Sequence, residues 1–401
     1  MKRDTATEKK SSRYLIVAAD VQKRSGLLAP VFKLYDYLSN VSWVPTSMKA
    51  LEEAERRLFL KVKSYIRSRY VPVWNGRYQV WTVAINAPAS SILQTYQASQ
   101  QQFTNMNSIS EKIPLVMVHG FAGGVGLWAQ NLDALAKDRT VYAFDLLGFG
   151  RSSRPKFSRD PTLAETEWVR SIEEWRSEMR LDKMILLGHS LGGYLASAYA
   201  LEHPEHVRHL ILVEPWGSMP KPAHNDRQYA LPVWVRTLAH IASMFNPLST
   251  LRAAGPWGPS LVRRVRGDLG RKFGNGNSAD EEAIFDYIYH CNAQEPSGET
   301  AFKALSASFG WAKRPMIDRL PQLRNDVPIT FVYGSRSWMD AGPGYEMQQN
   351  LRPESYVSVH VVGGAGHHVY ADESEQFNVL VTGVCRLVDN EADDVDDRND
   401  F

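Results

Sequence analysis

A serine flanked by glycines follows a short apolar run near the middle of the chain. Gly188-His189-Ser190-Leu191-Gly192 comes directly after the run 184–187, and a small-residue, helix-like segment follows it. A strand-to-helix turn of the form Gly-x-Ser-x-Gly presents the serine hydroxyl at the edge of a sheet, and its glycines leave room for the neighbouring backbone. The flanking segments favour this turn over an ordinary loop. Ser190 is therefore the predicted catalytic nucleophile.

Two later loops offer the partners that such a serine needs. A serine hydroxyl becomes nucleophilic when a base takes its proton and a third group orients that base. Asp340 is the first carboxylate after the apolar run 329–333, and it is favoured as the acid, with capping of the following helix as its alternative role. His367 follows a glycine-rich string after the last expected strand, and it is favoured over the adjacent His368 as the base.

Backbone N–H groups would complete a site for acyl transfer. An oxyanion develops on the attacked carbonyl, and each donor aimed at it contributes about 3–4 kcal/mol. The N–H of Leu191 is one expected donor, and the N–H of Phe121, in the loop after the expected strand 114–119, is the other. Adjacent histidines lack the ligand spacing of a zinc site, so no metal and no cofactor are expected.

A second glycine pattern is typical of a different class of protein. Gly124, Gly126 and Ala129 follow a strand and match G-x-G-x-x-A, and Asp145 comes about 20 residues later, as a dinucleotide-binding fingerprint requires. The turn before Gly124 is longer than that fingerprint allows, and two strand-like segments precede it. Acyl transfer is favoured, and dinucleotide binding is the alternative.

Alternating strand-like and helix-like segments would position these residues. The alternation is typical of a mostly parallel sheet covered by helices on both faces. A hairpin around Asn75-Gly76 precedes it, and a long irregular insertion interrupts it, as a cap over a site does. Strands are expected over 114–119, 140–145, 183–187, 207–213, 329–333 and 356–362, and helices over 51–67, 127–137, 165–179, 191–202, 232–245, 280–290 and 374–388.

The same pattern divides the chain into five parts. They are an N-terminal polar and amphipathic region over 1–69, an α/β core over 70–218 and 324–388, a helical cap inserted over 219–323 after the sixth strand, and an acidic, disordered tail over 389–401. The stretch 26–38 within the first part either packs on the body or lies on a lipid surface.

Composition excludes several classes of protein. The 46 basic and 44 acidic side chains nearly balance, which argues against a partner such as nucleic acid bound by bulk charge. Two cysteines, Cys291 and Cys385, are too few for a disulfide framework and favour a reducing, cytoplasmic location. No apolar run approaches the roughly 18 residues that span a bilayer. The chain is expected to be soluble or peripheral to a membrane.

Long and irregular strings across the chain resemble the α/β-hydrolase domain-containing protein 4 and 5 family, which acts in lipid metabolism. The resemblance covers about residues 43–388 and implies an α/β-hydrolase fold with a cap. The strings that carry it lie at 43–47, 142–155, 171–176, 213–217, 289–292, 296–303 and 310–316.

The resemblance implies two alternative functions. Member 4 keeps the serine and is a phospholipase B-like hydrolase of N-acyl phosphatidylethanolamines and their lyso forms. Member 5 has asparagine there and acts as a coactivator of a triglyceride lipase on lipid droplets. Ser190 places this chain with the hydrolase branch, whereas Arg336 and Gly366 match the coactivator branch at positions tied to lipase activation. The string from His367 to Asp372 also matches a His-x-x-x-x-Asp motif linked to lysophosphatidic acid acyltransferase activity.

Partners follow from the same resemblance. The expected substrate is a phospholipid or lysophospholipid, met at a membrane or lipid-droplet surface, and a triglyceride lipase or droplet-coat protein is a further partner under the coactivator alternative. Two features of the cap fit a lipid but have ordinary alternatives. Its aromatic residues suit an acyl chain or a packed core, and its basic residues suit an anionic headgroup or a solvated face. They are Trp216, Trp234, Phe245 and Trp257, and Arg263, Arg264, Arg266, Arg271 and Lys272, respectively.

Overall fold

The computed structural model describes residues 44–87, 94–95, 112–219, 248–274, 278–308 and 311–399. The expectations for residues 1–43, for the helix over 232–245 and for Trp234 and Phe245 lie outside the described residues, as does most of the stretch 88–111.

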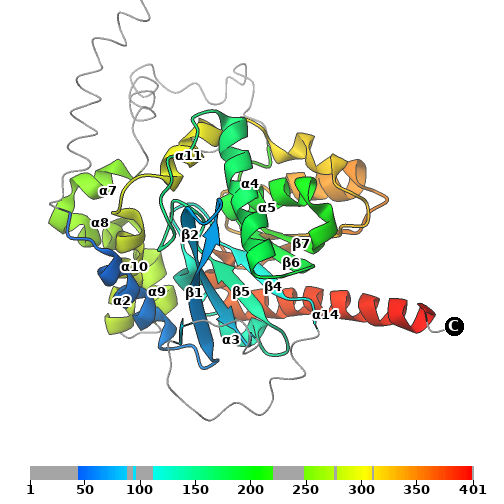
Figure 1. Ribbon diagram of the computed structural model, residues 1–401, viewed down its shortest axis with the longest axis horizontal. Helices are drawn as coiled ribbons and strands as arrows, with labels where there is room; N and C mark the ends of the chain where they lie inside the picture. Colours follow the sequence, from blue (N-terminus) through cyan, green and yellow to red (C-terminus); the bar gives the residue numbers. More distant parts are fainter. Residues whose placement is uncertain are drawn as a thin grey trace, which may run out of the picture.

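A single twisted sheet of nine strands forms the centre of the described chain (Figure 1). Its order is β11-β10-β7-β6-β4-β5-β2-β1-β3, and the six strands from β11 to β5 run parallel. The hairpin of β1 and β2 joins antiparallel to β5, and its turn places Asn75 and Gly76 at positive φ, as expected. The strands are β1 Ile66–Val73, β2 Tyr78–Ile85, β3 Gln94–Thr95, β4 Leu115–Val118, β5 Val141–Phe144, β6 Met184–His189, β7 Val207–Val213, β10 Ile329–Gly334 and β11 Val357–Val362.

Helices cover both faces of this sheet and bury two apolar cores. Alternate residues of β4 point to opposite faces, so Val116 and Val118 join one core whereas Leu115 and Met117 join the other. Helices α4 (Pro161–Glu178) and α5 (Leu191–Glu202) pack on the first face, and α3 (Leu132–Leu135), α13 (Val369–Asp372) and α14 (Ser374–Asn399) pack on the second.

The segment between β7 and β10 is largely helical, and we call it the cap. It contains α7 Ser249–Ala253, α8 Gly258–Val265, α9 Gly267–Gly274, α10 Ser278–Asn292 and α11 Gly298–Leu305, and the short β8 Ser306–Ser308 and β9 Trp311–Ala312 follow. Helix α2 (Met48–Phe59) packs against α10 of the cap, so an N-terminal segment and the cap lie side by side (Figure 1).

Three expected elements differ from the structure. The helix expected over 51–67 ends at Phe59, because residues from Ile66 onward pair with β2 and this tertiary pairing overrides local helix preference. The helix expected over 127–137 is broken into a 3-10 turn, Val125–Trp128, and the short α3. The disordered tail expected from residue 389 is also wrong for most of its length, since α14 continues to Asn399.

The glycine pattern of the dinucleotide alternative has a packing role in the structure. A Cβ atom on Gly124 or Gly126 would collide with the ring or hydroxyl of Tyr287 from α10. The Asp145 carboxylate is fully buried and accepts the backbone N–H groups of Val125 and Arg151, at 2.7 Å each. These glycines therefore serve close packing against the protein's own cap, and the structure offers no support for the dinucleotide alternative among the described residues.

Among the described helices, none combines the length and the apolar character that crossing a membrane would take.

Candidate active site

Ser190 lies at a sharp turn between β6 and α5. Its backbone has φ 53° and ψ −116°, in the left-handed region that non-glycine residues rarely adopt. A Cβ atom on Gly188 would collide with the Gly192 backbone, and one on Gly192 would collide with the carbonyls of Val118 and His119. The glycines thus permit the close packing that the turn requires, and the turn has the form predicted from the sequence.

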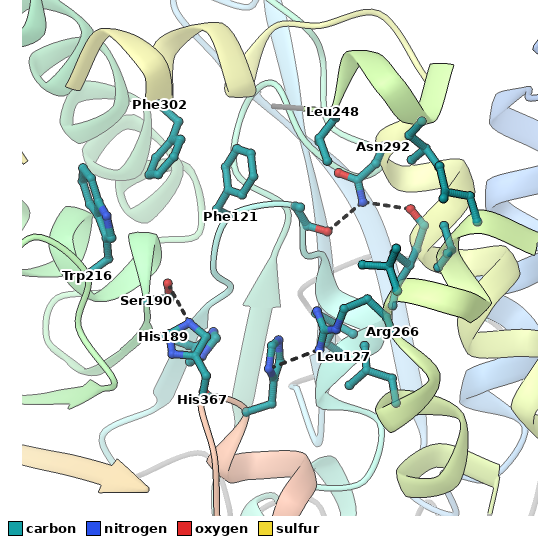
Figure 2. A pocket seen from close by; sticks show the side chains of 18 of the residues that line it. Phe121, Leu127, His189, Ser190, Trp216, Leu248, Arg266, Asn292, Phe302 and His367 are labelled. Atoms are coloured by element: carbon teal, nitrogen blue, oxygen red, sulfur yellow. Dashed lines mark hydrogen bonds between the residues drawn. The ribbon is translucent and has the colours of Figure 1, made fainter. Parts of the chain in front are cut away.

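His367 reaches Ser190 from a loop near the end of the chain. Its Nε2 lies 3.2 Å from the Ser190 hydroxyl oxygen (Figure 2). The loop is held in place by the neighbouring His189, whose Nε2 lies 2.8 Å from the His367 carbonyl oxygen. The structure therefore brings together the two residues that the sequence predicts as nucleophile and base, and it places His368 elsewhere, against Arg266 of the cap.

Glu214, and not Asp340, is the carboxylate on the other side of His367. Its Oε2 lies 3.2 Å from His367 Nδ1, and its side chain is fully buried at the end of β7. The Gly334 N–H, at 2.6 Å, and the Ser337 hydroxyl also donate to this carboxylate. With Nδ1–H donating to Glu214, Nε2 is free to accept the serine proton.

The placement of Asp340 corrects the sequence-based assignment of the acid. Its side chain is exposed, and Oδ1 accepts the N–H of Gly342, the first residue of the following helix, at 3.0 Å. A sequence signal for Glu214 exists, because it is a carboxylate directly after β7 and β7 is the neighbour of the nucleophile strand. Glu214 and Asp340 both lie between Ser190 and His367 in the chain, as the order serine, acid, histidine of this type of site requires. The choice between them therefore depends on the path of the His367 loop.

The loop after β4 lies against Ser190 and is held by two hydrogen bonds from side chains. A Cβ atom on Gly120 would come within 3.0 Å of the Ser190 Cβ, so the backbone that leads to Phe121 passes directly over the nucleophile. His119 Nδ1 bonds the Gly120 carbonyl at 2.8 Å, and Asn292 of α10 donates to the Ala122 carbonyl at 2.8 Å. Leu191 begins α5, where helix N–H groups have no partner within the helix.

We expect acidification to destabilise the protein through His119. Its Nε2 accepts the Leu146 N–H at 3.0 Å, which requires the neutral imidazole, and burial lowers its pKa to about 4. The unfolded pKa is about 6.5, so this stabilisation is complete above that pH and is lost as the pH falls toward 4. Linkage gives a loss of about 2 kcal/mol between pH 7 and pH 5.

Urea unfolding of the wild type and of His119→Gln at both pH values measures this effect. The difference in unfolding free energy between the two proteins should shrink by about 2 kcal/mol at pH 5. A difference that does not change with pH would contradict the assignment.

A predominantly apolar pocket of about 450 Å³ opens next to Ser190. Phe121, Trp216 and Phe302 lie on one side of the nucleophile, and Leu127 and Arg266 lie on the other (Figure 2). The Phe121 and Phe302 rings are 4.4 Å apart between centroids, and Trp216 and Phe302 are 4.7 Å apart. A pocket of this size and polarity can hold an acyl chain next to the nucleophile.

The residues singled out by the family resemblance lie around the His367 loop. The Asp372 carboxylate accepts the Gly366 N–H at 2.7 Å and pairs with Lys272 of α9. The exposed Arg336 side chain binds the Gly364 carbonyl, at 2.8 Å from Nε. Asp372, Gly366 and Arg336 therefore support the loop that carries the base, and no contact of theirs with Ser190 is found among the described residues.

Comparison with known proteins agrees with the fold. Residues 113–374 match the model of the family described as alpha/beta hydrolase fold, and the chain belongs to that family. It is 48% identical to the human (lyso)-N-acylphosphatidylethanolamine lipase, across 86% of this chain and 94% of that protein. It is 46% identical to human 1-acylglycerol-3-phosphate O-acyltransferase ABHD5, across 86% of this chain and 92% of that one. The resemblance described from the sequence is confirmed.

Solved structures agree at the level of the fold. The chain is similar to a membrane phospholipase A described as a bacterial virulence factor, with a TM-score of 0.56 and 18% identity over 95% of this chain and 99% of that one. It is also similar to the carboxylesterase CesB of Bacillus subtilis, with a TM-score of 0.54 and 17% identity over 83% and 95% of the two chains.

Proposed function

We propose that this protein is a serine hydrolase that cleaves an acyl ester of a glycerophospholipid, of the N-acyl phosphatidylethanolamine or lysophospholipid type. The observation that carries the proposal is the chain of contacts from Ser190 through His367 to Glu214 beside an apolar pocket. The identity of nearly half of all aligned residues with (lyso)-N-acylphosphatidylethanolamine lipases supports the substrate class.

The contacts suggest the following sequence of steps. The Ser190 oxygen attacks the ester carbon while His367 Nε2 takes its proton, and the Glu214 carboxylate stabilises the resulting imidazolium. The oxyanion accepts the N–H groups of Phe121 and Leu191. His367 then gives the proton to the departing glycerol oxygen, which leaves an acyl-enzyme. Water, activated by the same imidazole, releases the fatty acid and restores the serine.

Covalent labelling tests the nucleophile directly. A serine-directed fluorophosphonate should modify the purified protein once, and peptide mass spectrometry should locate the label at Ser190. Lipid profiling after incubation with N-acyl phosphatidylethanolamine and its lyso form should show release of fatty acid. A protein that is folded but neither labelled nor active on these lipids would refute the proposal.

Acyl transfer is a second candidate, because a lysophospholipid hydroxyl can replace water at the acyl-enzyme. A close relative is named as a 1-acylglycerol-3-phosphate O-acyltransferase, and the His367 to Asp372 string is present here. Asp372 contacts the Gly366 N–H and Lys272, so it is placed to position the base and not to bind an acceptor.

We expect Asp372→Ala to lower hydrolysis and acyl transfer by the same factor, about 10-fold. The variant removes the hydrogen bond between the Asp372 carboxylate and the Gly366 N–H, which supports the His367 loop. Both reactions would use the same His367. Product analysis with a radiolabelled acyl donor, with and without lysophosphatidic acid, measures both rates. Selective loss of transfer would instead indicate that Asp372 acts on the acceptor.

Activation of a separate triglyceride lipase is the non-enzymatic alternative. Arg336 lies on the loop after β10 and Gly366 on the loop after β11, which also carries His367. Arg336 is exposed, so it is accessible to a partner protein. Under either function we propose a cytoplasmic protein that associates peripherally with membranes or lipid droplets. Fluorescence microscopy of the tagged full chain in lipid-loaded cells tests this location.

A further inference from the structure

One cationic side chain enters the apolar pocket beside Ser190. Of the described residues that line the pocket, Arg266 is the only lysine or arginine, and His368 beside it is buried, which lowers its pKa well below the usual value and keeps it neutral. Arg266 follows α8 directly, where that helix meets α9, and lies across the pocket from Trp216 in Figure 2. A guanidinium at the wall of an apolar cavity is suited to bind an anionic group of a ligand whose acyl chain lies in that cavity.

The contacts of Arg266 fix one edge of its guanidinium and leave the other available. Nε and Nη2 donate to the two oxygens of Asp268, at 3.1 and 3.2 Å, and Nη2 also lies 3.4 Å from His368 Nδ1. Nη1 makes no hydrogen bond to any described residue. Because the side chain remains one-third exposed, a ligand in the pocket can reach the two N–H groups of Nη1.

The other four members of the basic cluster noted in the sequence are placed differently. Arg263 pairs with Glu282 at the surface, and Lys272 pairs with Asp268 and Asp372. Arg264 and Arg271 are exposed and do not line the pocket. The basic cluster noted in the sequence therefore contributes one member to the site.

We propose that Arg266 binds the phosphate of a glycerophospholipid whose acyl ester lies at Ser190. This inference rests on the proposed hydrolase function and assigns it a headgroup subsite. A guanidinium edge makes strong, charge-assisted hydrogen bonds to phosphate oxygens, while the apolar lining accommodates the acyl chain. Asp268 and His368 hold the guanidinium in the orientation that this contact needs. The subsite distinguishes a phospholipid from a neutral glycerol ester with the same chain.

Two soluble substrates with the same ester separate this recognition from catalysis. They are 1-hexanoyl-lysophosphatidylethanolamine and 1-monohexanoylglycerol, used as monomers so that no lipid surface contributes. Arg266→Gln should lower kcat/KM for the phospholipid by about 10- to 100-fold, with a much smaller loss on the neutral ester. Arg266→Lys should recover part of the difference, since it restores the charge without the planar fork.

Arg271→Gln is the matched control, because it removes a positive charge from the exposed surface of α9, the helix that follows Arg266. Its kcat/KM values should stay within about two-fold of the wild type on both substrates, if the charge acts locally at Arg266. Equal losses by Arg266→Gln on the two substrates would overturn the inference and leave the hydrolase proposal intact. A loss of selectivity in Arg271→Gln would also overturn it, in favour of general electrostatic attraction.

A binding measurement keeps the subsite testable if the wild type hydrolyses neither ester. Isothermal titration of Ser190→Ala with the lysophospholipid, compared with the double variant that also carries Arg266→Gln, measures affinity without turnover. At least 10-fold weaker binding by the double variant supports the phosphate site even though the proposed hydrolysis has failed. Equal affinities overturn it.

Discussion

Ser190→Ala is expected to lower kcat for lysophospholipid hydrolysis by about 10⁵- to 10⁶-fold, to the level that binding and the oxyanion donors alone provide. The alanine removes the attacking oxygen, which lies 3.2 Å from His367 Nε2, and no other described group is placed to replace it. Fatty-acid release by the purified protein measures the loss. The unfolding temperature should change little, because the hydroxyl forms no other hydrogen bond with a described residue.

The same variant separates the hydrolase from the coactivator alternative. In cells that express a triglyceride lipase, an adaptor would stimulate lipolysis equally well with serine or alanine at position 190. Unchanged lipolysis with Ser190→Ala, combined with no lipid hydrolysis by the purified wild type, would favour the adaptor. Loss of a purified activity would favour the hydrolase.

The second large effect is expected from Glu214→Gln, which should lower kcat by about 10³- to 10⁴-fold. The amide keeps the shape of the side chain but loses the charge that stabilises the His367 imidazolium. It can also place an N–H group against Nδ1, which would favour the wrong tautomer. Rates on a monomeric ester across pH 6–9 measure the loss and show whether raising the pH restores activity.

Asp340→Asn is the matched control for Glu214→Gln. It makes the same carboxylate-to-amide change at an exposed residue that contacts the Gly342 N–H, so kcat should stay within about three-fold of the wild type. If Asp340→Asn lost activity and Glu214→Gln kept it, Asp340 would orient the base during turnover, as the sequence alone suggests.

The sequence predicts the sheet and two of the three residues in the Ser190–His367–Glu214 chain of contacts, because those features leave local signals. The strands β4, β6, β7 and β10 are largely apolar, as strands buried on both faces tend to be, and their ends lie within a few residues of the expected bounds. The Gly-x-Ser-x-Gly string and the glycines before His367 mark turns that few other residues allow. Both kinds of signal depend on residues that are adjacent in the sequence, so they can be recognised without knowledge of the fold.

The acid and several helix ends depend on contacts between distant segments. Glu214 and Asp340 follow β7 and β10, two adjacent parallel strands, so both carboxylates lie at the same edge of the sheet. Only the course of the His367 loop, held by His189 and by Asp372, decides which one meets the imidazole. Similarly, β1 begins at Ile66 because β2 pairs with it there, which local helix preference does not reveal.

The ion pair between Lys272 and Asp372 ties the cap to the catalytic loop. The same Asp372 carboxylate accepts the Gly366 N–H, so a displacement of α9 that broke the ion pair would leave this carboxylate without its cation. The position of α9 and the alignment of the His367 imidazole are therefore coupled through this one carboxylate.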